Sequence, residues 1–187
     1  EMLGEHGELT HGLLPFAGAR RVPLLLAGPG VPAGRTSNCL TATADVAPTL
    51  LALAGVTPPD GLDGRALVRV QLPGAAAAAA AAADAAETAA DAADCQRVAY
   101  SESFLPFYAY KWYPLRTLSD GRALYLQAPR PGLFRLDSDP GEAHDLAAAE
   151  PALVQLWGSR LERLLAAAGE KLEEAKSPQA TLDEEQR

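Results

Sequence analysis

The chain has 187 residues, of which 48% are hydrophobic and 21% are charged, and its net charge is −8. This length can bury one sizeable core, and the composition is that of an ordinary globular protein. The acidic balance argues against a nucleic-acid-binding protein, which would normally carry a basic surface. We therefore expect no nucleic-acid partner. The only long apolar tract is interrupted by acidic residues, so we also expect no membrane span.

The chain opens on a segment dense in titratable and flexible residues, EMLGEHGELTHGLL. A histidine such as His6 or His11 can donate a hydrogen bond to an anion or exchange a proton near neutral pH. The surrounding glycines allow the backbone to turn tightly and to approach a ligand closely. A loop histidine bonded to a backbone carbonyl is the commoner case, so the residue types alone leave both roles open.

The first block, residues 1–74, predicts the end of an α/β layer structure. Val22–Leu26 form a short apolar run closed by glycine and proline, which is typical of a strand buried on both faces. Asp45 can then cap a helix that tolerates Pro48 in its first turn and stops at Gly55. A buried strand followed by a helix indicates the edge of a helix-flanked sheet.

The second block, residues 75–94, is alanine-rich, acidic and of low complexity. We interpret it as a solvated, partly helical linker or insertion, with an interaction helix as the alternative. Residues 95–176 predict a small α+β subdomain, and residues 177–187 predict a polar tail. Cys39 and Cys95 match no metal-ligand spacing, and we interpret them as buried or free thiols.

The subdomain at 95–176 predicts an antiparallel sheet of roughly four short strands and one long helix. RVAYSES and GLFRLD are typical of strands, and LRTLSDGRALYLQ predicts a hairpin because Asp120-Gly121 supports positive φ in a tight turn. DPGE predicts a turn. Pro151 suits the first position of an amphipathic helix. Its expected apolar face is formed by Leu153, Leu156, Trp157, Leu161, Leu164, Leu165, Ala168 and Leu172.

Six aromatic residues lie between Phe104 and Tyr113. The simpler interpretation is that they pack the subdomain onto the rest of the protein. The alternative is a wall of a substrate cleft, in which Trp112 stacks on a sugar or aryl ring and Lys111 lies near an anion. Lys111 and Trp112 are therefore candidate substrate-binding residues.

The order of these motifs resembles the downstream half of a sulfatase of the alkaline phosphatase superfamily. The pieces that carry the resemblance are EMLGEHGELTHGLLPF, RRVPLLLAGPG, ADVAPTLLALAGV, LDGRAL, YSES and LFRLDSDPGEAHDLA. It covers nearly everything except the alanine-rich tract. The implied fold is α/β: the end of a sulfatase-like mixed sheet in residues 1–74, followed by a C-terminal α+β subdomain.

The resemblance also implies a sulfuric ester hydrolase with a formylglycine nucleophile and a divalent cation, usually calcium. Neither cysteine lies in a formylglycine motif, and the metal ligands are expected just upstream of Glu1, so we expect this fragment alone to be inactive. His11 stands where the family places a Lys or His against the sulfate oxygens, which makes it the candidate catalytic residue. His6 is expected to order the loop. Phe16-Ala17 replaces the family's Tyr-Glu, which weakens the expected fixation of that loop.

The implied substrate is a small-molecule or carbohydrate sulfate ester, and a periplasmic or extracellular location is the expectation. Two alternatives stay open. A phosphodiesterase or phosphonate hydrolase of the same superfamily would share the fold, and a non-catalytic protein could keep the scaffold as a binding module.

Overall fold

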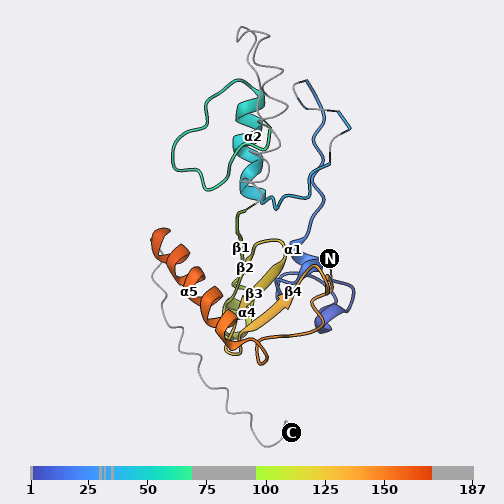
Figure 1. The fold of residues 1–187 in the computed structure, drawn as a ribbon, viewed down its shortest axis with the longest axis vertical. Coiled ribbons are helices and arrows are strands. Elements are labelled where there is room, and N and C mark those ends of the chain that lie inside the picture. Colours follow the sequence, from blue (N-terminus) through green and yellow to red (C-terminus); the bar gives the residue numbers. More distant parts are fainter. Residues whose placement is uncertain (1, 30, 32, 35, 69–95, 170–187) are drawn as a thin grey trace, which may run out of the picture. The chain divides into compact units, whose positions relative to one another are not determined.

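The structure is a computed structural model that describes residues 2–29, 31, 33–34, 36–68 and 96–169 (Figure 1). The chain divides into two compact units. Unit 1 combines Glu1–Val22 with Tyr100–Arg187, and unit 2 is Pro23–Ala99. The predicted linker at 75–94 and tail at 177–187 lie outside the described residues.

Unit 1 is built on a four-stranded sheet in the order β1-β2-β3-β4. The strands are β1 (Ala99–Ser103), β2 (Leu115–Ser119), β3 (Ala123–Gln127) and β4 (Gly132–Arg135). β2 pairs antiparallel with β3, and β3 pairs antiparallel with β4. The prediction of a small sheet of about four short strands is confirmed.

The turn between β2 and β3 forms where the sequence predicts it. Gly121 has a φ of 88°, a conformation that side chains with a Cβ rarely adopt. The Asp120 carboxylate accepts the backbone N–H groups of Arg122 at 2.9 Å and Ala123 at 2.8 Å. An aspartate that bonds its own turn in this way fixes the hairpin register.

Helix α5 (Pro151–Ala167) packs against β3 (Figure 1). Its buried side chains are Trp157, Leu161 and Leu165, which recur at helical spacing. The predicted helix is confirmed, but its expected apolar face is wrong at Leu156, which is 58% exposed, and at Ala168, which is exposed just beyond the end of the helix. Leu172 lies outside the described residues.

The N-terminal segment covers the sheet face opposite α5. Tyr125 approaches Gly158 of α5, whereas its chain neighbours Leu124 and Leu126 join a core cluster with Met2, Phe16 and Phe134. Successive side chains of a strand point to opposite faces, so the cluster and the helix occupy different sides. This arrangement places the histidine-bearing segment on the sheet. The short helices of unit 1 are η1 (Glu5–Gly7), α1 (Ala17–Arg20) and α4 (Leu105–Tyr110).

Unit 2 contains η2 (Thr43–Asp45) and α2 (Val46–Leu53). The helix lies where the sequence predicts it and is followed by Gly55, whose φ is 73°. The predicted capping role of Asp45 is wrong, because its side chain makes no cap hydrogen bond to α2. Its fully buried carboxylate instead binds Arg97 and accepts the N–H groups of Ala42 and Arg65.

The predicted strand at Val22–Leu26 does not form. Val22 is 65% exposed and Leu25 is 87% exposed, whereas Leu24 and Leu26 line a small apolar pocket with Val46, Thr49, Leu50 and Leu67. A strand buried on both faces needs hydrogen-bonded neighbours and two covering layers. The described residues of unit 2 provide one partial layer and no neighbouring strand at this run, so the segment stays extended without pairing.

Cys39 is disulfide-bonded, so the expectation of a free thiol is wrong at this position. Cys95 lies outside the described residues. Within the part of the chain that the structure describes, none of the helices combines the length and apolar character that a bilayer crossing requires.

Candidate functional site

The loop that carries His6 and His11 is closed by its own backbone and by one buried carboxylate. The N–H of Met2 donates to the Thr10 carbonyl at 2.8 Å. The carboxylate of Glu8, which is 4% exposed, accepts the N–H groups of Leu13 at 3.0 Å and Leu14 at 2.8 Å. A carboxylate that satisfies two adjacent backbone donors fixes the chain just after His11.

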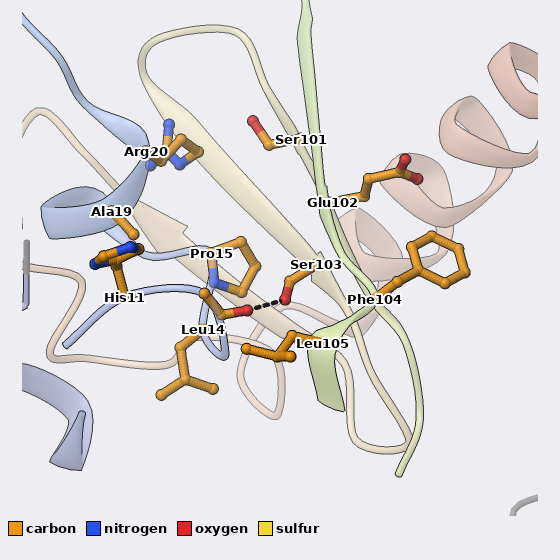
Figure 2. A pocket seen from close by; sticks show the side chains of 11 residues that line it. His11, Leu14, Pro15, Ala19, Arg20, Ser101, Glu102, Ser103, Phe104 and Leu105 are labelled. Atoms are coloured by element: carbon orange, nitrogen blue, oxygen red, sulfur yellow. Dashed lines mark hydrogen bonds between the residues drawn. The ribbon is translucent and has the colours of Figure 1, made fainter. Parts of the chain in front are cut away.

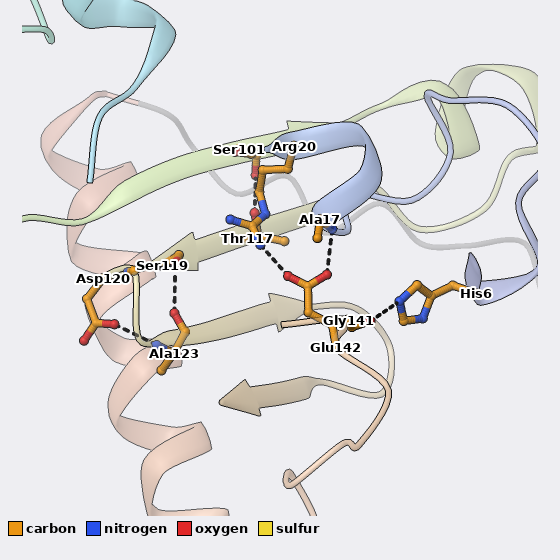
Figure 3. Close-up of polar contacts among 11 residues, drawn as sticks. His6, Ala17, Arg20, Ser101, Thr117, Ser119, Asp120, Ala123, Gly141 and Glu142 are labelled. Carbon is orange, nitrogen blue, oxygen red and sulfur yellow. Dashed lines mark hydrogen bonds and ion pairs between the residues drawn. The ribbon is translucent and has the colours of Figure 1, made fainter. Parts of the chain in front are cut away.

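His6 contributes to the packing of this loop. Its ring stacks on Phe16 with a centroid separation of 3.7 Å and an interplanar angle of 10°. Its Nε2 lies 3.1 Å from the carbonyl oxygen of Gly141, at hydrogen-bond distance (Figure 3). Phe16 in turn meets Phe134 of β4 edge to face at 5.6 Å. These contacts agree with the expected loop-ordering role of His6.

His11 lies on the wall of a pocket with a cavity volume of about 480 Å³. One wall comes from the N-terminal segment and α1, and the other comes from β1 and the start of α4 (Figure 2). The lining residues are His11, Gly12, Leu14, Pro15, Ala19, Arg20, Ser101, Glu102, Ser103, Phe104 and Leu105. The Ser103 hydroxyl donates to the Gly12 carbonyl and joins the two walls beside His11.

The α1 wall is held from the DPGE turn. The predicted turn is present, because the N–H of Glu142 donates to the Asp139 carbonyl at 3.0 Å. The Glu142 side chain is fully buried, accepts the Ala17 N–H at 2.6 Å and forms an ion pair with Arg20 (Figure 3). The methyl side chain of Ala17 cannot form a hydrogen bond that fixes the loop. The Glu142 carboxylate, which is 125 residues away in the sequence, fixes it through the Ala17 N–H instead.

Glu102 is a carboxylate on the β1 wall, and it accepts a hydrogen bond from the Tyr100 hydroxyl. Burial raises the pKa of Tyr100 well above its usual range, and the bond to Glu102 raises it further. The phenol therefore stays protonated at neutral pH and remains a donor to Glu102. One carboxylate oxygen of Glu102 is thus already engaged within the strand.

The structure places Lys111 and Trp112 at the far end of α4 and does not include them in the pocket lining. The Lys111 Nζ lies 3.3 Å from the Tyr108 carbonyl oxygen, and Lys111 itself adopts a left-handed conformation with a φ of 59°. The Trp112 ring is 57% exposed and stacks on Tyr110 at 4.9 Å. His11 and these two candidates are therefore not brought together.

Arg20, Glu102 and Glu142 are site residues that sequence reasoning missed. Glu142 stands in the DPGE motif, which predicted only a turn, and Glu102 stands in YSES, which predicted only a strand. Arg20 directly precedes the Arg-Val-Pro motif. Short sequence motifs cannot predict the ion pair between Arg20 and Glu142, because the two residues lie 122 positions apart.

Metal binding by this chain finds no support in the described residues. Across residues 2–68 and 96–169, with their short gaps, no group of three or more His, Cys, Asp or Glu side chains could hold a metal ion. The acidic DPGE turn is no exception, since the Glu142 carboxylate is already bound to Arg20 and to the Ala17 N–H.

No protein-family model matches the chain. Sequence similarity is found to two curated proteins that are named as extracellular sulfatases. The chain is 38% identical over 68 residues to a Sulf-1 homolog of Caenorhabditis elegans, a match that covers 36% of this chain and 10% of that protein. It is 37% identical over 70 residues to the SULF-1 homolog of Drosophila melanogaster, covering 37% of this chain and 6% of that protein. The matched part is therefore a small fraction of these relatives.

The fold is similar to that of a sulfatase-type protein from Bacteroides thetaiotaomicron whose crystal structure is known. The superposition has a TM-score of 0.63 at 20% sequence identity and covers 88% of this chain and 33% of that one. At this identity the likeness establishes the fold, and the fold agrees with the curated sequence relatives. The chain is therefore similar to sulfatases in sequence over about a third of its length and in fold over most of it.

Proposed function

We propose that the complete protein to which these residues belong hydrolyses sulfate esters, and that His11 contacts the sulfate group. The observation that carries the proposal is that His11 lines a pocket in a chain whose curated relatives are named sulfatases. Those names favour sulfate esters over the phosphate or phosphonate esters of the alternative, and they also favour an enzyme over a binding module.

The role proposed for His11 is electrostatic. Negative charge builds on the sulfuryl oxygens and on the leaving oxygen as the ester bond breaks. A donor or cation fixed beside those oxygens lowers the barrier because it needs no reorganisation during the reaction. The Glu8 bonds to Leu13 and Leu14 and the Ser103 bond to Gly12 hold the backbone that carries His11, which is the preorganisation this role requires.

The nucleophile and the metal of this proposal are formylglycine and a divalent cation, with calcium expected from the family resemblance. The described residues offer no ligand set for such a cation, so we assign no step of the reaction to it here. The proposal requires that the complete protein supply both groups from residues beyond those that the structure describes. The 187-residue chain alone is then expected to bind a sulfate group without turning it over.

The proposed substrates are aryl or carbohydrate sulfate esters. The cavity of about 480 Å³ is large enough for a sulfate group with part of the attached ring. Lys111 and Trp112 stay candidate contacts for a larger substrate, beyond the His11 pocket. We also propose an extracellular or periplasmic location, which the names of the two relatives and the disulfide at Cys39 support.

The test is a comparison of ester substrates with the complete protein. We expect hydrolysis of 4-nitrophenyl sulfate to exceed that of 4-nitrophenyl phosphate and bis(4-nitrophenyl) phosphate by about a hundredfold or more in kcat/KM, a difference typical of a site built for one reacting group. Preference for the phosphodiester would support the alternative hydrolase. The absence of turnover on all three esters, in a protein shown to carry formylglycine and metal, would support a binding module.

A further inference from the structure

We propose that Arg20 is a second anion-binding residue of the His11 pocket and determines its preference for a sulfate-type anion. This inference rests on the proposed function, because it concerns the same pocket. It adds a residue that neither the sequence motifs nor the comparisons assign. The observations behind it are the place of Arg20 on the pocket wall, its limited exposure and its unequal set of hydrogen bonds.

Arg20 lines the pocket with His11, and its side chain is 12% exposed. An arginine with so little exposure is normally paired by several groups, because a buried charge is costly. The Glu142 carboxylate accepts from Nη2. The Arg20 Nε is buried and has no hydrogen-bond partner among the described residues. The guanidinium is thus held at one end and incompletely satisfied at another.

Glu142 fixes the direction of Arg20. One of its carboxylate oxygens binds the guanidinium, and the other accepts the N–H of Ala17, the first residue of α1 (Figure 3). Glu142 therefore holds both ends of the four-residue helix that carries Arg20. A guanidinium has five N–H donors in a planar fork, so it can bind this carboxylate along one edge and an anion along another.

Arg20 supplies the pocket wall with a permanent cation. The ionisable residues of the wall are His11, Arg20 and Glu102. Glu102 accepts a hydrogen bond from Tyr100 within β1 through one carboxylate oxygen. Arg20 keeps its charge at any physiological pH and matches tetrahedral oxyanions through paired N–H groups. A sulfate group in the cavity would accept from guanidinium N–H groups that Glu142 does not engage, while the ion pair with Glu142 is kept.

A purely structural ion pair is the competing account, and the chain contains a suitable control. Arg135 and Glu150 form an Arg–carboxylate pair within unit 1, with a separation of 3.2 Å, and the Arg135 side chain is 54% exposed. Neither residue lines the His11 pocket. Arg135→Met removes the same charge from the same unit, and it should leave anion binding at the pocket unchanged.

The experiment is a titration of the 187-residue chain with sodium sulfate, against sodium chloride at equal ionic strength, followed by NMR. The probes are the His11 ring and the backbone amides of Gly12 and Ala19, and thermal unfolding checks the fold of each variant. We expect Arg20→Met to weaken sulfate binding by about tenfold or more, the usual effect of losing a charged hydrogen bond. Arg20→Lys, which keeps the charge without the fork, should lie between it and the wild type.

Each outcome decides between the claims. Sulfate binding that is unchanged in Arg20→Met overturns the role of Arg20 and leaves that of His11 intact. If Arg20→Met does not fold, Arg20→Lys decides in the same way: wild-type affinity overturns the proposal, and weaker binding supports it. If the wild-type chain shows no response specific to sulfate, the pocket is not an anion site, and the roles of His11 and Arg20 fail together.

Discussion

The two units bury different kinds of side chain. In unit 1 the sheet is apolar on both faces, with Leu161 and Leu165 of α5 on one side and Met2 and Phe16 on the other. In unit 2 the fully buried side chains around α2 are Asp45, Pro48 and Thr49, while Leu50 is 57% exposed. Among the described residues, unit 1 thus combines two apolar layers with its own buried ion pair, Arg20–Glu142, whereas the fully buried side chains around α2 in unit 2 centre on the Asp45–Arg97 pair and its hydrogen bonds.

The difference shows where apolar patterns are informative. In unit 1 each apolar run finds its partners within the same unit, so periodicity predicts the strands and the helix. The run at Val22–Leu26 lies in unit 2 from Pro23 onward; it meets one partial layer among the described residues, and the predicted strand does not form. The following predictions test this contrast, from the largest expected effect to the smallest.

The largest effect is expected at Asp45. Asp45→Ala removes the carboxylate that pairs with Arg97 and accepts two backbone N–H groups, and it leaves those groups without their acceptor. Breaking a buried ion pair in this way costs about 3–5 kcal/mol in the free energy of unfolding. Urea unfolding followed by the NMR signals of α2 measures the change.

Asp60→Ala is the matched control for Asp45→Ala, because Asp60 is an exposed aspartate of the same unit. It should change the free energy of unfolding by less than about 0.5 kcal/mol. Equal effects of the two substitutions would show that the Asp45–Arg97 pair does not stabilise unit 2.

In unit 1 the largest effect is expected in the apolar core. Leu161→Ala empties a fully buried position of α5 and should lower the free energy of unfolding by about 3 kcal/mol. Leu156→Ala is the control, since Leu156 lies on the same helix and is 58% exposed. Thermal or urea unfolding of both variants measures the difference. Similar losses would mean that α5 packs through a different face.

A pH effect should appear in unit 2 at acid pH. Burial alone would raise the pKa of Asp45, but the N–H groups of Ala42 and Arg65 and the Arg97 guanidinium outweigh it and hold this pKa below its usual range. A carboxyl with a lower pKa in the folded state stabilises it above its unfolded pKa of about 4, and this contribution is lost as the pH falls through the folded pKa.

The expected result is a free energy of unfolding for unit 2 that declines below about pH 4, measured from the α2 signals. The Asp60→Asn variant should keep the decline, and Asp45→Asn should show a weaker one. An identical pH dependence in the two variants would contradict the assignment to Asp45.

The smallest effect is expected at Leu25. Leu25→Ser changes a side chain that is 87% exposed, so the free energy of unfolding should change by less than about 0.5 kcal/mol. The measurement is urea unfolding of the 187-residue chain. A decrease of 2 kcal/mol or more in the free energy of unfolding, as for a buried leucine, would contradict this account and support the predicted strand buried on both faces.

Much of unit 1 could be predicted from local sequence. Pro151 begins α5, Gly121 takes the positive φ of the hairpin, and the DPGE residues form a turn. These features depend on the conformational preferences of single residues and on short-range periodicity. The same preferences suggested that Asp45 caps a helix. Its side chain instead binds Arg97, which lies 52 residues away in the sequence.

The candidate site was predictable only in part. The histidines stand out because they lie in a short glycine-rich segment, and the family resemblance assigns His11 its role. Arg20 and Glu142 form an ion pair across 122 residues, and no local pattern reports such a contact. Sequence reasoning therefore proposed the residue on the loop and did not propose the residues that the fold brings close to it.

The central claim is that His11 contacts the sulfate ester in the complete protein. The most direct measurement compares the hydrolysis of 4-nitrophenyl sulfate by the wild type, His11→Ala and His144→Ala, with His144 as an exposed control. The account predicts that His11→Ala lowers kcat by about 100- to 1,000-fold, as for the loss of one preorganised donor, while His144→Ala keeps wild-type activity. Wild-type kcat in a folded His11→Ala enzyme would contradict it.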